Sequence, residues 1–245
     1  MNADINENCK HELVVGVVGG MGPEATADFY LKLLAVTPAA KDQDHLRVII
    51  DSNGKVPDRV ASILGSGESS APVLQDMAKG LQQAGAELLV IPCNTAHYYY
   101  DDVQAAVSIP VMHMQQEVMA YISKEAELNP ENAMTRIGLL ATAATVKTGL
   151  YQRFAAQAGI DIIDVEDEVQ ETLVTEGIRA VKAGDKEKGH DLLRQAALTL
   201  INRGALGIIA GCTEIPLVLT DGDLPVPVID STAILALATL RAAKG

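Results

Sequence analysis

The feature that most constrains this chain is a strand-and-cysteine pattern that occurs twice. One apolar run leads into Ile91-Pro92-Cys93-Asn94-Thr95, and a second leads into Ala210-Gly211-Cys212-Thr213-Glu214. The cysteines lie 119 positions apart, about half of the 245 residues. An earlier strand pattern also repeats, with Gly16 and Gly138 at equivalent places 122 positions apart. Two offsets this similar indicate an internal duplication.

Short apolar, β-branched runs alternate with helical patterns along the chain. This alternation is typical of α/β proteins with parallel sheets. We therefore expect an α/β fold of two pseudo-symmetric domains, each a parallel-stranded sheet flanked by helices, with the active site in the interdomain cleft. The expected limits are a flexible tail at 1–12, a first domain at 13–114, a second at 115–225, and at 226–245 a C-terminal strand and helix that return to the first domain.

Composition excludes several classes of function. The formal net charge of −13 argues against nucleic-acid binding and against anionic membranes. No apolar run approaches the roughly 18–20 residues of a membrane span, and residues 1–11 lack the apolar core of a signal peptide. Three cysteines without a CxxC pair make neither a disulfide framework nor a metal site. We expect a cytoplasmic protein in which Cys9 is incidental.

Cys93 and Cys212 each end a predicted strand, where ligands of parallel sheets bind. Most free cysteines are inert and buried, but polar residues follow both of these, and the amides of a following helix favour thiolate. Two opposed thiols can remove a proton from one face of an amino-acid α-carbon and return one to the other. The carbanion between these steps needs hydrogen-bond support, for which Asn94, Thr95 and Thr213 are candidates.

Other motifs allow other interpretations. His97 follows Cys93 by four residues and could form a cysteine–histidine nucleophile pair, but Pro216 stands at the matching place in the second half. The run Gly19-Gly20-Met21-Gly22 is not a full dinucleotide motif, and better suits backbone amides that approach a small carboxylate. Arg59 is a candidate carboxylate binder that Asp58 could orient.

Six segments together resemble the aspartate/glutamate racemase superfamily, and most of all its cofactor-independent aspartate racemases. The resemblance extends over nearly the whole chain after the tail, and the segments that carry it are Gly19–Thr26, Val56–Arg59, Pro92–His97, Leu139–Thr142, Val181–Gly184 and Gly211–Glu214.

The resemblance implies a homodimer that binds a small acidic amino acid and uses Cys93 and Cys212 as its two acid/base catalysts, with no pyridoxal phosphate and no metal. It further implies that Asp58, Arg59 and Lys182 meet the substrate carboxylates, and that Glu214, where glutamate racemases carry histidine, favours aspartate. The complete set of expected substrate-binding residues is Met21, Asn53, Asp58, Arg59, Asn94, Thr95, Thr142, Thr145, Lys182, Thr213 and Glu214.

The prediction is therefore a racemase that interconverts L- and D-aspartate. A glutamate or broader amino-acid racemase is the alternative in the same class. Related enzymes with a similar cleft include decarboxylases and isomerases with a nucleophilic cysteine, and fold alone does not separate them. The alternative of another class is a non-catalytic domain that binds or senses amino acids.

Overall fold

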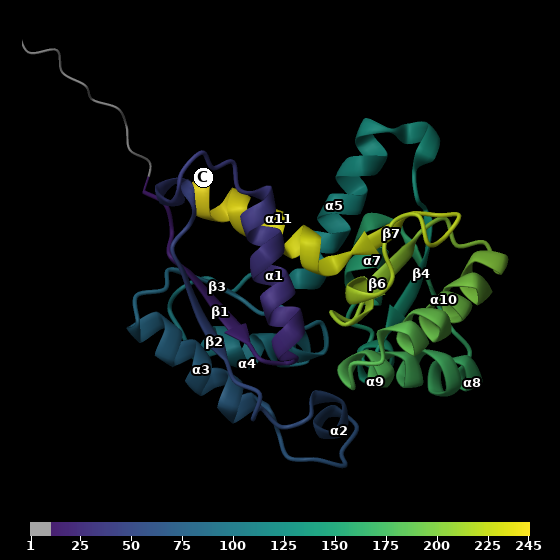
Figure 1. Ribbon diagram of the computed structural model, residues 1–245, viewed down its shortest axis with the longest axis horizontal. Helices are drawn as coiled ribbons and strands as arrows, with labels where there is room; N and C mark the ends of the chain where they lie inside the picture. Colours follow the sequence, from purple (N-terminus) through teal and green to yellow (C-terminus); the bar gives the residue numbers. More distant parts are fainter. Residues whose placement is uncertain (1–10) are drawn as a thin grey trace, which may run out of the picture.

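The computed structural model describes residues 11–245, which form two parallel sheets, one in each half of the chain (Figure 1). Cys9 and most of the expected tail lie outside the described residues. The first sheet has the strand order β2-β1-β3 and the second β5-β4-β6-β7. The strands are β1 (Val15–Gly19), β2 (Val48–Ser52), β3 (Leu88–Val90), β4 (Arg136–Ala141), β5 (Asp161–Asp164), β6 (Ile208–Gly211) and β7 (Val228–Asp230).

Helices flank both sheets. The α-helices are α1 (Pro23–Val36), α2 (Arg59–Ile63), α3 (Ala71–Gln83), α4 (Tyr100–Ala105), α5 (Met114–Leu128), α6 (Ala143–Lys147), α7 (Gln152–Ala158), α8 (Asp167–Val169), α9 (Glu176–Lys182), α10 (Lys186–Asn202) and α11 (Ser231–Lys244). Short 3₁₀ turns are η1 (Asp42–Asp44), η2 (Thr95–Tyr99), η3 (Pro130–Asn132) and η5 (Ile215–Leu217), and η4 (Gln170–Thr175) is a π-helix. Within residues 11–245, no helix has the length and apolar character needed to cross a membrane.

The two halves share one topology, which confirms the predicted α/β fold with two parallel sheets. In the first half, β1 pairs with β2 and β3, and Val111 makes a parallel bridge beyond β3. In the second half, β4 pairs with β5 and β6, and β7 lies beyond β6. Each central strand is therefore flanked in the same order.

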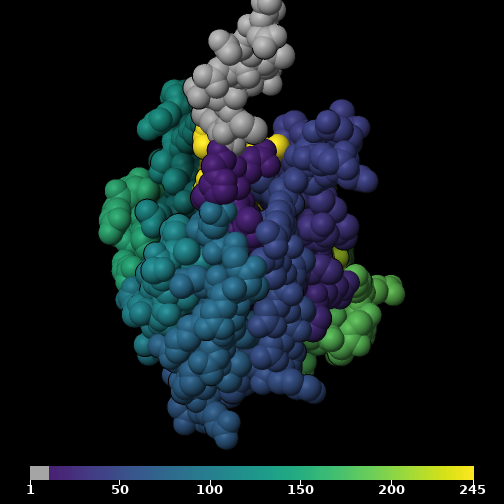
Figure 2. All heavy atoms as spheres, turned by 90° about the vertical axis from the view of Figure 1, so that its left-hand side faces the viewer, coloured from purple at the N-terminus to yellow at the C-terminus, as the bar shows by residue number. Residues whose placement is uncertain are grey.

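The segment at 226–245 divides between the two halves. Its strand, β7, pairs with β6 in the second sheet, whereas α11 packs beside α1 of the first half (Figure 1). Atoms of this C-terminal segment show in yellow among those of the first half in Figure 2. The Leu13 amide donates to the Ala243 carbonyl at 2.9 Å, so both ends of the described chain meet. The domain limits at 114 and 225 stay predictions.

Gly16 and Gly138 have the same task in the two halves. A Cβ at Gly16 would lie 2.6 Å from a Leu89 side-chain carbon, and one at Gly138 would lie 2.7 Å from a side-chain carbon of Ile208. In each half the central strand is thus pressed against the strand that leads to the cysteine, and only glycine fits this approach.

Gly138→Ala should lower the free energy of unfolding by about 1–3 kcal/mol, because the added methyl group overpacks a buried contact. Gly80→Ala is the matched control. Gly80 is exposed on α3 with nothing near its Cβ position, so alanine should stabilise that helix by about 0.5–1 kcal/mol. Urea unfolding of both variants checks this. A Gly138→Ala protein as stable as Gly80→Ala would contradict the account.

His97 fastens the cysteine-bearing turn to α5. Its Nδ1 atom lies 2.9 Å from the Cys93 carbonyl oxygen, and its Nε2 atom accepts the Met114 amide at 3.0 Å. The ring is therefore neutral, with its proton on Nδ1. Burial lowers the pKa of His97 to about 4, although the backbone hydrogen bonds oppose this shift. The predicted alternative of a cysteine–histidine pair is not supported, because the ring contacts the Cys93 carbonyl.

His113 lies behind His97 in a cluster of rings. Its ring centroid is 4.5 Å from that of Tyr100, 4.6 Å from Phe154 and 5.1 Å from His97. Burial, followed by the nearby His97 and Arg153, lowers the pKa of His113 to about 3. Both histidines thus stay neutral in the folded protein at pH values where they take up a proton in the unfolded chain.

The stability that these two histidines contribute should be complete above pH 6.5 and be lost as the pH falls toward 4, because there only the unfolded state binds the protons. His113→Phe keeps the ring packing and removes one site. As the pH falls over this range, the free energy of unfolding of this variant should decline less steeply than that of the unaltered protein. The two slopes should differ by up to about 1.4 kcal/mol per pH unit. Above pH 7 the two slopes should agree. Equal slopes below pH 6.5 would refute a neutral His113.

Candidate active site

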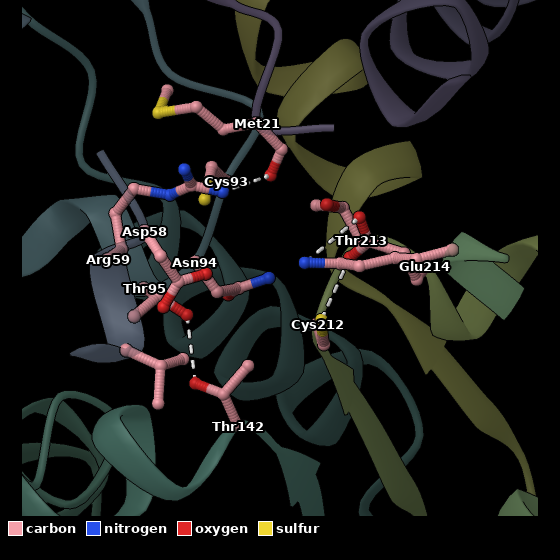
Figure 3. Close-up of a pocket in the computed structure, with 12 residues that line it drawn as sticks. Met21, Asp58, Arg59, Cys93, Asn94, Thr95, Thr142, Cys212, Thr213 and Glu214 are labelled. Carbon is pink, nitrogen blue, oxygen red and sulfur yellow. Dashed lines mark hydrogen bonds and ion pairs between the residues drawn. The ribbon is translucent and has the colours of Figure 1, made fainter. Parts of the chain in front are cut away.

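Two equivalent strand ends deliver the two thiols to one cavity. Cys93 follows β3 and Cys212 follows β6, and each residue is only 5% exposed. Both line a cavity of about 300 Å³, a volume that includes the open space at its mouth. Figure 3 shows that the thiols reach it from different halves of the chain. Each cysteine lies at the carboxyl edge of its own sheet, and the packing of the two halves brings these two edges to one cavity.

The cavity gathers nearly all of the residues predicted from sequence. Its walls are Met21, Asp58, Arg59, Val60, Cys93, Asn94, Thr95, Thr142, Lys182, Cys212, Thr213 and Glu214. Sequence reasoning missed Val60, an apolar residue in the first turn of α2. Its only available signal was that it directly follows the Asp58-Arg59 pair.

Asn53 and Thr145 were expected at the site but do not line this cavity. The Asn53 backbone packs against Gly20, whose φ is +90°, and its Oδ1 atom accepts the Lys55 amide at 2.9 Å. Thr145 is fully buried behind the wall, where its hydroxyl lies 3.0 Å from that of Thr142. Both residues therefore shape the site from behind.

Asn94 links the two halves through buried hydrogen bonds. Its Nδ2 atom donates to the Ser231 hydroxyl at 3.1 Å, and that hydroxyl donates to the Ala210 carbonyl at 2.7 Å. The Tyr151 hydroxyl donates to Asn94 Oδ1 at 2.6 Å, and burial raises the pKa of Tyr151 so that it stays a donor. The side-chain amide of Gln115 donates to the backbone carbonyl of Asn94 at 3.1 Å. The residue after Cys93 is thus tied to the strand that carries Cys212.

Thr95 makes a second link. Its hydroxyl lies 2.9 Å from that of Thr142 and 3.1 Å from that of Thr145. Thr213, by contrast, makes no side-chain hydrogen bond to any residue from 11 to 245, although it is only 1% exposed and lines the cavity. Of these three polar residues, Thr213 has the hydroxyl that is free for a bound molecule.

Cys212 is held as a thiol by Glu214. Its Sγ atom donates to Glu214 Oε2 at 3.0 Å, and Glu214 Oε1 lies 3.8 Å from Lys182 Nζ. Burial raises the pKa of Cys212 well above its usual value, the Glu214 carboxylate raises it further, and Lys182 opposes both. The expected stabilisation of a thiolate by backbone amides is outweighed here: the Glu214 amide lowers the pKa of Cys212, but burial and the Glu214 carboxylate raise it more.

Arg59 brings a cation that lacks a carboxylate partner among residues 11–245. Its guanidinium donates to the carbonyls of Val56, Pro57 and Met21 at 3.2, 3.1 and 3.4 Å, and its buried Nε makes no hydrogen bond. Asp58 does not orient it, since Asp58 Oδ1 caps α2 by accepting the Ala61 amide at 2.7 Å. Backbone carbonyls therefore position the arginine side chain at the cavity wall.

The glycine loop is less open to an anion than expected. The Gly20 amide already donates to the Thr26 hydroxyl at 2.8 Å, and from this loop only Met21 lines the cavity.

In the part of the chain that the structure describes, no group of three or more histidine, cysteine, aspartate or glutamate side chains could hold a metal ion.

These groups together allow proton transfer at a carbon atom beside a carboxylate. Arg59 and Lys182 supply positive charge, and Thr213 supplies a hydrogen bond to a bound anion. Both thiols line the same cavity, and the Cys212 thiol donates a hydrogen bond to Glu214.

The chain is similar to several known racemases. The broad-specificity amino-acid racemase RacX of Bacillus subtilis is 28% identical over 231 residues, which cover 93% of this chain and 96% of the relative. Among solved structures, the aspartate racemase of Picrophilus torridus has a TM-score of 0.84 at 27% identity and 94% coverage of both chains. An aspartate racemase homologue of Pyrococcus horikoshii has a TM-score of 0.74 at 26% identity, covering 94% of this chain and 99% of that one.

The family comparison covers almost the whole chain. The model of the Asp/Glu/Hydantoin racemase family matches residues 18–239, a range that includes both cysteine motifs and every residue of the cavity wall. By this match, the chain belongs to the Asp/Glu/hydantoin racemase family.

Proposed function

We propose that the protein interconverts L- and D-aspartate by two proton transfers, one at each cysteine. The observation that carries this proposal is the pair of buried thiols that reach one cavity from equivalent strand ends. Membership of a racemase family and the similarity to an aspartate racemase support it. Two carboxylates of an acidic substrate match the two cations in the wall, Arg59 and Lys182.

The reaction needs one thiolate and one thiol at a time. The thiolate takes the α-hydrogen, so that an S–H bond forms and the Cα–H bond breaks. The electron pair left on the α-carbon spreads into the α-carboxylate, which Arg59 and Lys182 stabilise. The opposite thiol then delivers its proton to the other face. Both transfers use side chains of this chain, so the proposed chemistry needs no pyridoxal phosphate or metal.

The surroundings of the two thiols favour different roles for them in the proposed mechanism. Cys212 donates a hydrogen bond to Glu214, which favours the role of acid for Cys212, and the proposed mechanism then gives Cys93 the role of base. A substrate of the opposite hand requires the reverse arrangement, which places a second negative charge beside Glu214. Lys182, 3.8 Å from that carboxylate, partly offsets this repulsion.

We further propose that the enzyme is a homodimer and works in the cytoplasm. Both proposals rest on the family resemblance and on the cysteine content of the sequence.

Cys93→Ala and Cys212→Ala should each lower the rate of aspartate racemisation by at least about a hundredfold, because either change removes one obligatory proton carrier. Chiral chromatography of the reaction in D₂O measures both inversion and α-deuterium. Cys9→Ala, which changes the third cysteine, should behave as the unaltered protein. Substantial racemisation by either of the first two variants would rule out the two-cysteine mechanism.

Glu214→Gln should lower the pKa of Cys212, because it removes the negative charge that opposes ionisation of the thiol and keeps the side-chain shape. The alkaline limb of the pH–rate profile, where Cys212 loses the proton it must deliver, should therefore move to lower pH. Ultraviolet absorbance of the thiolate in the Cys93→Ala background gives the same shift without turnover. Glu127→Gln, an exposed change on α5, is the control. If neither the alkaline limb of the pH–rate profile nor the titration of the thiolate absorbance moves, this role of Glu214 is disproved.

A further inference from the structure

Three fully buried residues hold the side chain of Asn94 from behind the cavity wall. Asn94 lines the cysteine cavity, and its side chain extends from the first half of the chain toward Cys212 (Figure 3). Gln115, Tyr151 and Ser231 are fully buried and do not line that cavity. The contacts of these three residues therefore decide which end of the Asn94 amide faces a bound molecule.

Two of the three residues identify the oxygen and the nitrogen of the Asn94 amide independently. Gln115 Nε2 donates to the backbone carbonyl of Asn94, which can only accept, and the same Nε2 lies 3.3 Å from Asn94 Oδ1. The amide atom nearest Gln115 must therefore be an acceptor, which is the oxygen. At the other end, the Ser231 hydroxyl donates its hydrogen to the Ala210 carbonyl. It can then only accept from Asn94, so the atom on that side is the nitrogen.

Tyr151 makes the shortest hydrogen bond to this amide. Its hydroxyl donates to Asn94 Oδ1 at 2.6 Å, compared with 3.3 Å for Gln115. Burial raises the pKa of Tyr151, so the hydroxyl keeps the hydrogen that it donates. A half-turn of the Asn94 amide would leave both buried donors without their acceptor, and such a loss is costly. Tyr151 is therefore the main barrier to that half-turn.

One hydrogen of the Asn94 amide is left for the cavity. Nδ2 carries two hydrogens, and among residues 11–245 it donates only to Ser231. The three partners of the amide lie behind the wall, so the second hydrogen is available on the side that both thiols line. An N–H group there can donate to a carboxylate oxygen. That hydrogen bond strengthens when the α-proton leaves, because negative charge then builds up on the oxygen.

We propose that Tyr151 is a positioning residue, which holds the Asn94 amide with its free hydrogen toward the α-carboxylate of the substrate. This inference rests on the proposed racemase function and adds a residue from outside the cavity wall. Tyr151 does not touch the substrate and transfers no proton, so it acts only through Asn94. Without the Tyr151 hydroxyl, the amide can turn and present its oxygen to the cavity, where the oxygen repels a carboxylate.

The first experiment compares Tyr151→Phe with Tyr100→Phe. Each change removes one hydroxyl and keeps the ring, and the Tyr100 hydroxyl donates to the Val111 carbonyl at 2.9 Å, away from the cysteine cavity. Tyr151→Phe should lower kcat/KM for aspartate by about five- to twentyfold. This is less than the full loss of a hydrogen bond to a charged group, because Gln115 still favours the correct orientation. Tyr100→Phe should leave kcat/KM unchanged.

Calorimetry with succinate measures the same effect without turnover. Succinate carries two carboxylates but no amino group, so it occupies the site and cannot racemise. Tyr151→Phe should raise its dissociation constant several-fold, whereas Tyr100→Phe should not change it. A loss of stability alone would not separate the two variants in this way, because each loses one hydrogen bond to an oxygen.

A double-mutant cycle tests whether Tyr151 acts through Asn94. Asn94→Ala removes the amide, so the further change Tyr151→Phe should alter kcat/KM by less than about twofold. If the role of Tyr151 is only structural, Tyr151→Phe lowers kcat/KM by the same factor in both backgrounds. Should Asn94→Ala fail to fold, the succinate affinities of the two tyrosine variants decide.

The outcomes separate this inference from the proposed function. An unchanged kcat/KM in Tyr151→Phe, an unchanged affinity for succinate, or equal factors with and without Asn94 would each overturn the positioning role and leave the racemase intact. If the unaltered protein exchanges the α-hydrogen of no amino acid, the proposed function fails. Succinate then decides about Tyr151: binding that is weakened by Tyr151→Phe and not by Tyr100→Phe supports the role, and equal binding or none overturns it.

Discussion

The site depends on one buried chain of hydrogen bonds that joins the two cysteine-bearing strands. Asn94 donates to Ser231, and Ser231 donates to the carbonyl of Ala210, two residues before Cys212. Asn94 and Ser231 are almost fully buried, where an unpaired polar group is costly. Separation of the two strand ends would leave these buried groups without hydrogen bonds. The hydrogen bonds therefore fix the relative position of the strand ends. A reaction in which one thiol takes a proton from a carbon and another delivers a proton to its opposite face needs a fixed distance between the two thiols.

The internal duplication makes the two thiols equivalent in the backbone but not in their surroundings. Thr95 and Glu214 occupy equivalent places, two residues after each cysteine. Thr95 forms hydrogen bonds with neutral hydroxyls, whereas Glu214 accepts a hydrogen bond from the Cys212 thiol and pairs with Lys182. In the first repeat, Thr95 thus links the two halves. In the second repeat, Glu214 raises the pKa of the Cys212 thiol. In the proposed mechanism, this asymmetry favours Cys212 as the first acid.

Local sequence patterns were sufficient for the strand ends and for the cysteines that follow them, because strand periodicity and the edge of a parallel sheet are local rules. The same patterns could not reveal what each polar side chain contacts. Asn94 bonds to Ser231, 137 positions away, so its role in joining the halves was invisible. Asp58 was expected to orient its neighbour Arg59, but the nearby Ala61 amide at the start of α2 competes for the same carboxylate.

The central claim is that different groups remove and return the α-proton. The direct test is the position of deuterium at early times, when L-aspartate reacts in D₂O and the two enantiomers are separated before analysis. The account predicts that the D-aspartate formed carries deuterium at its α-carbon while the recovered L-aspartate still carries protium. Product that retains the hydrogen of the substrate would show that a single group serves both faces, and would contradict it.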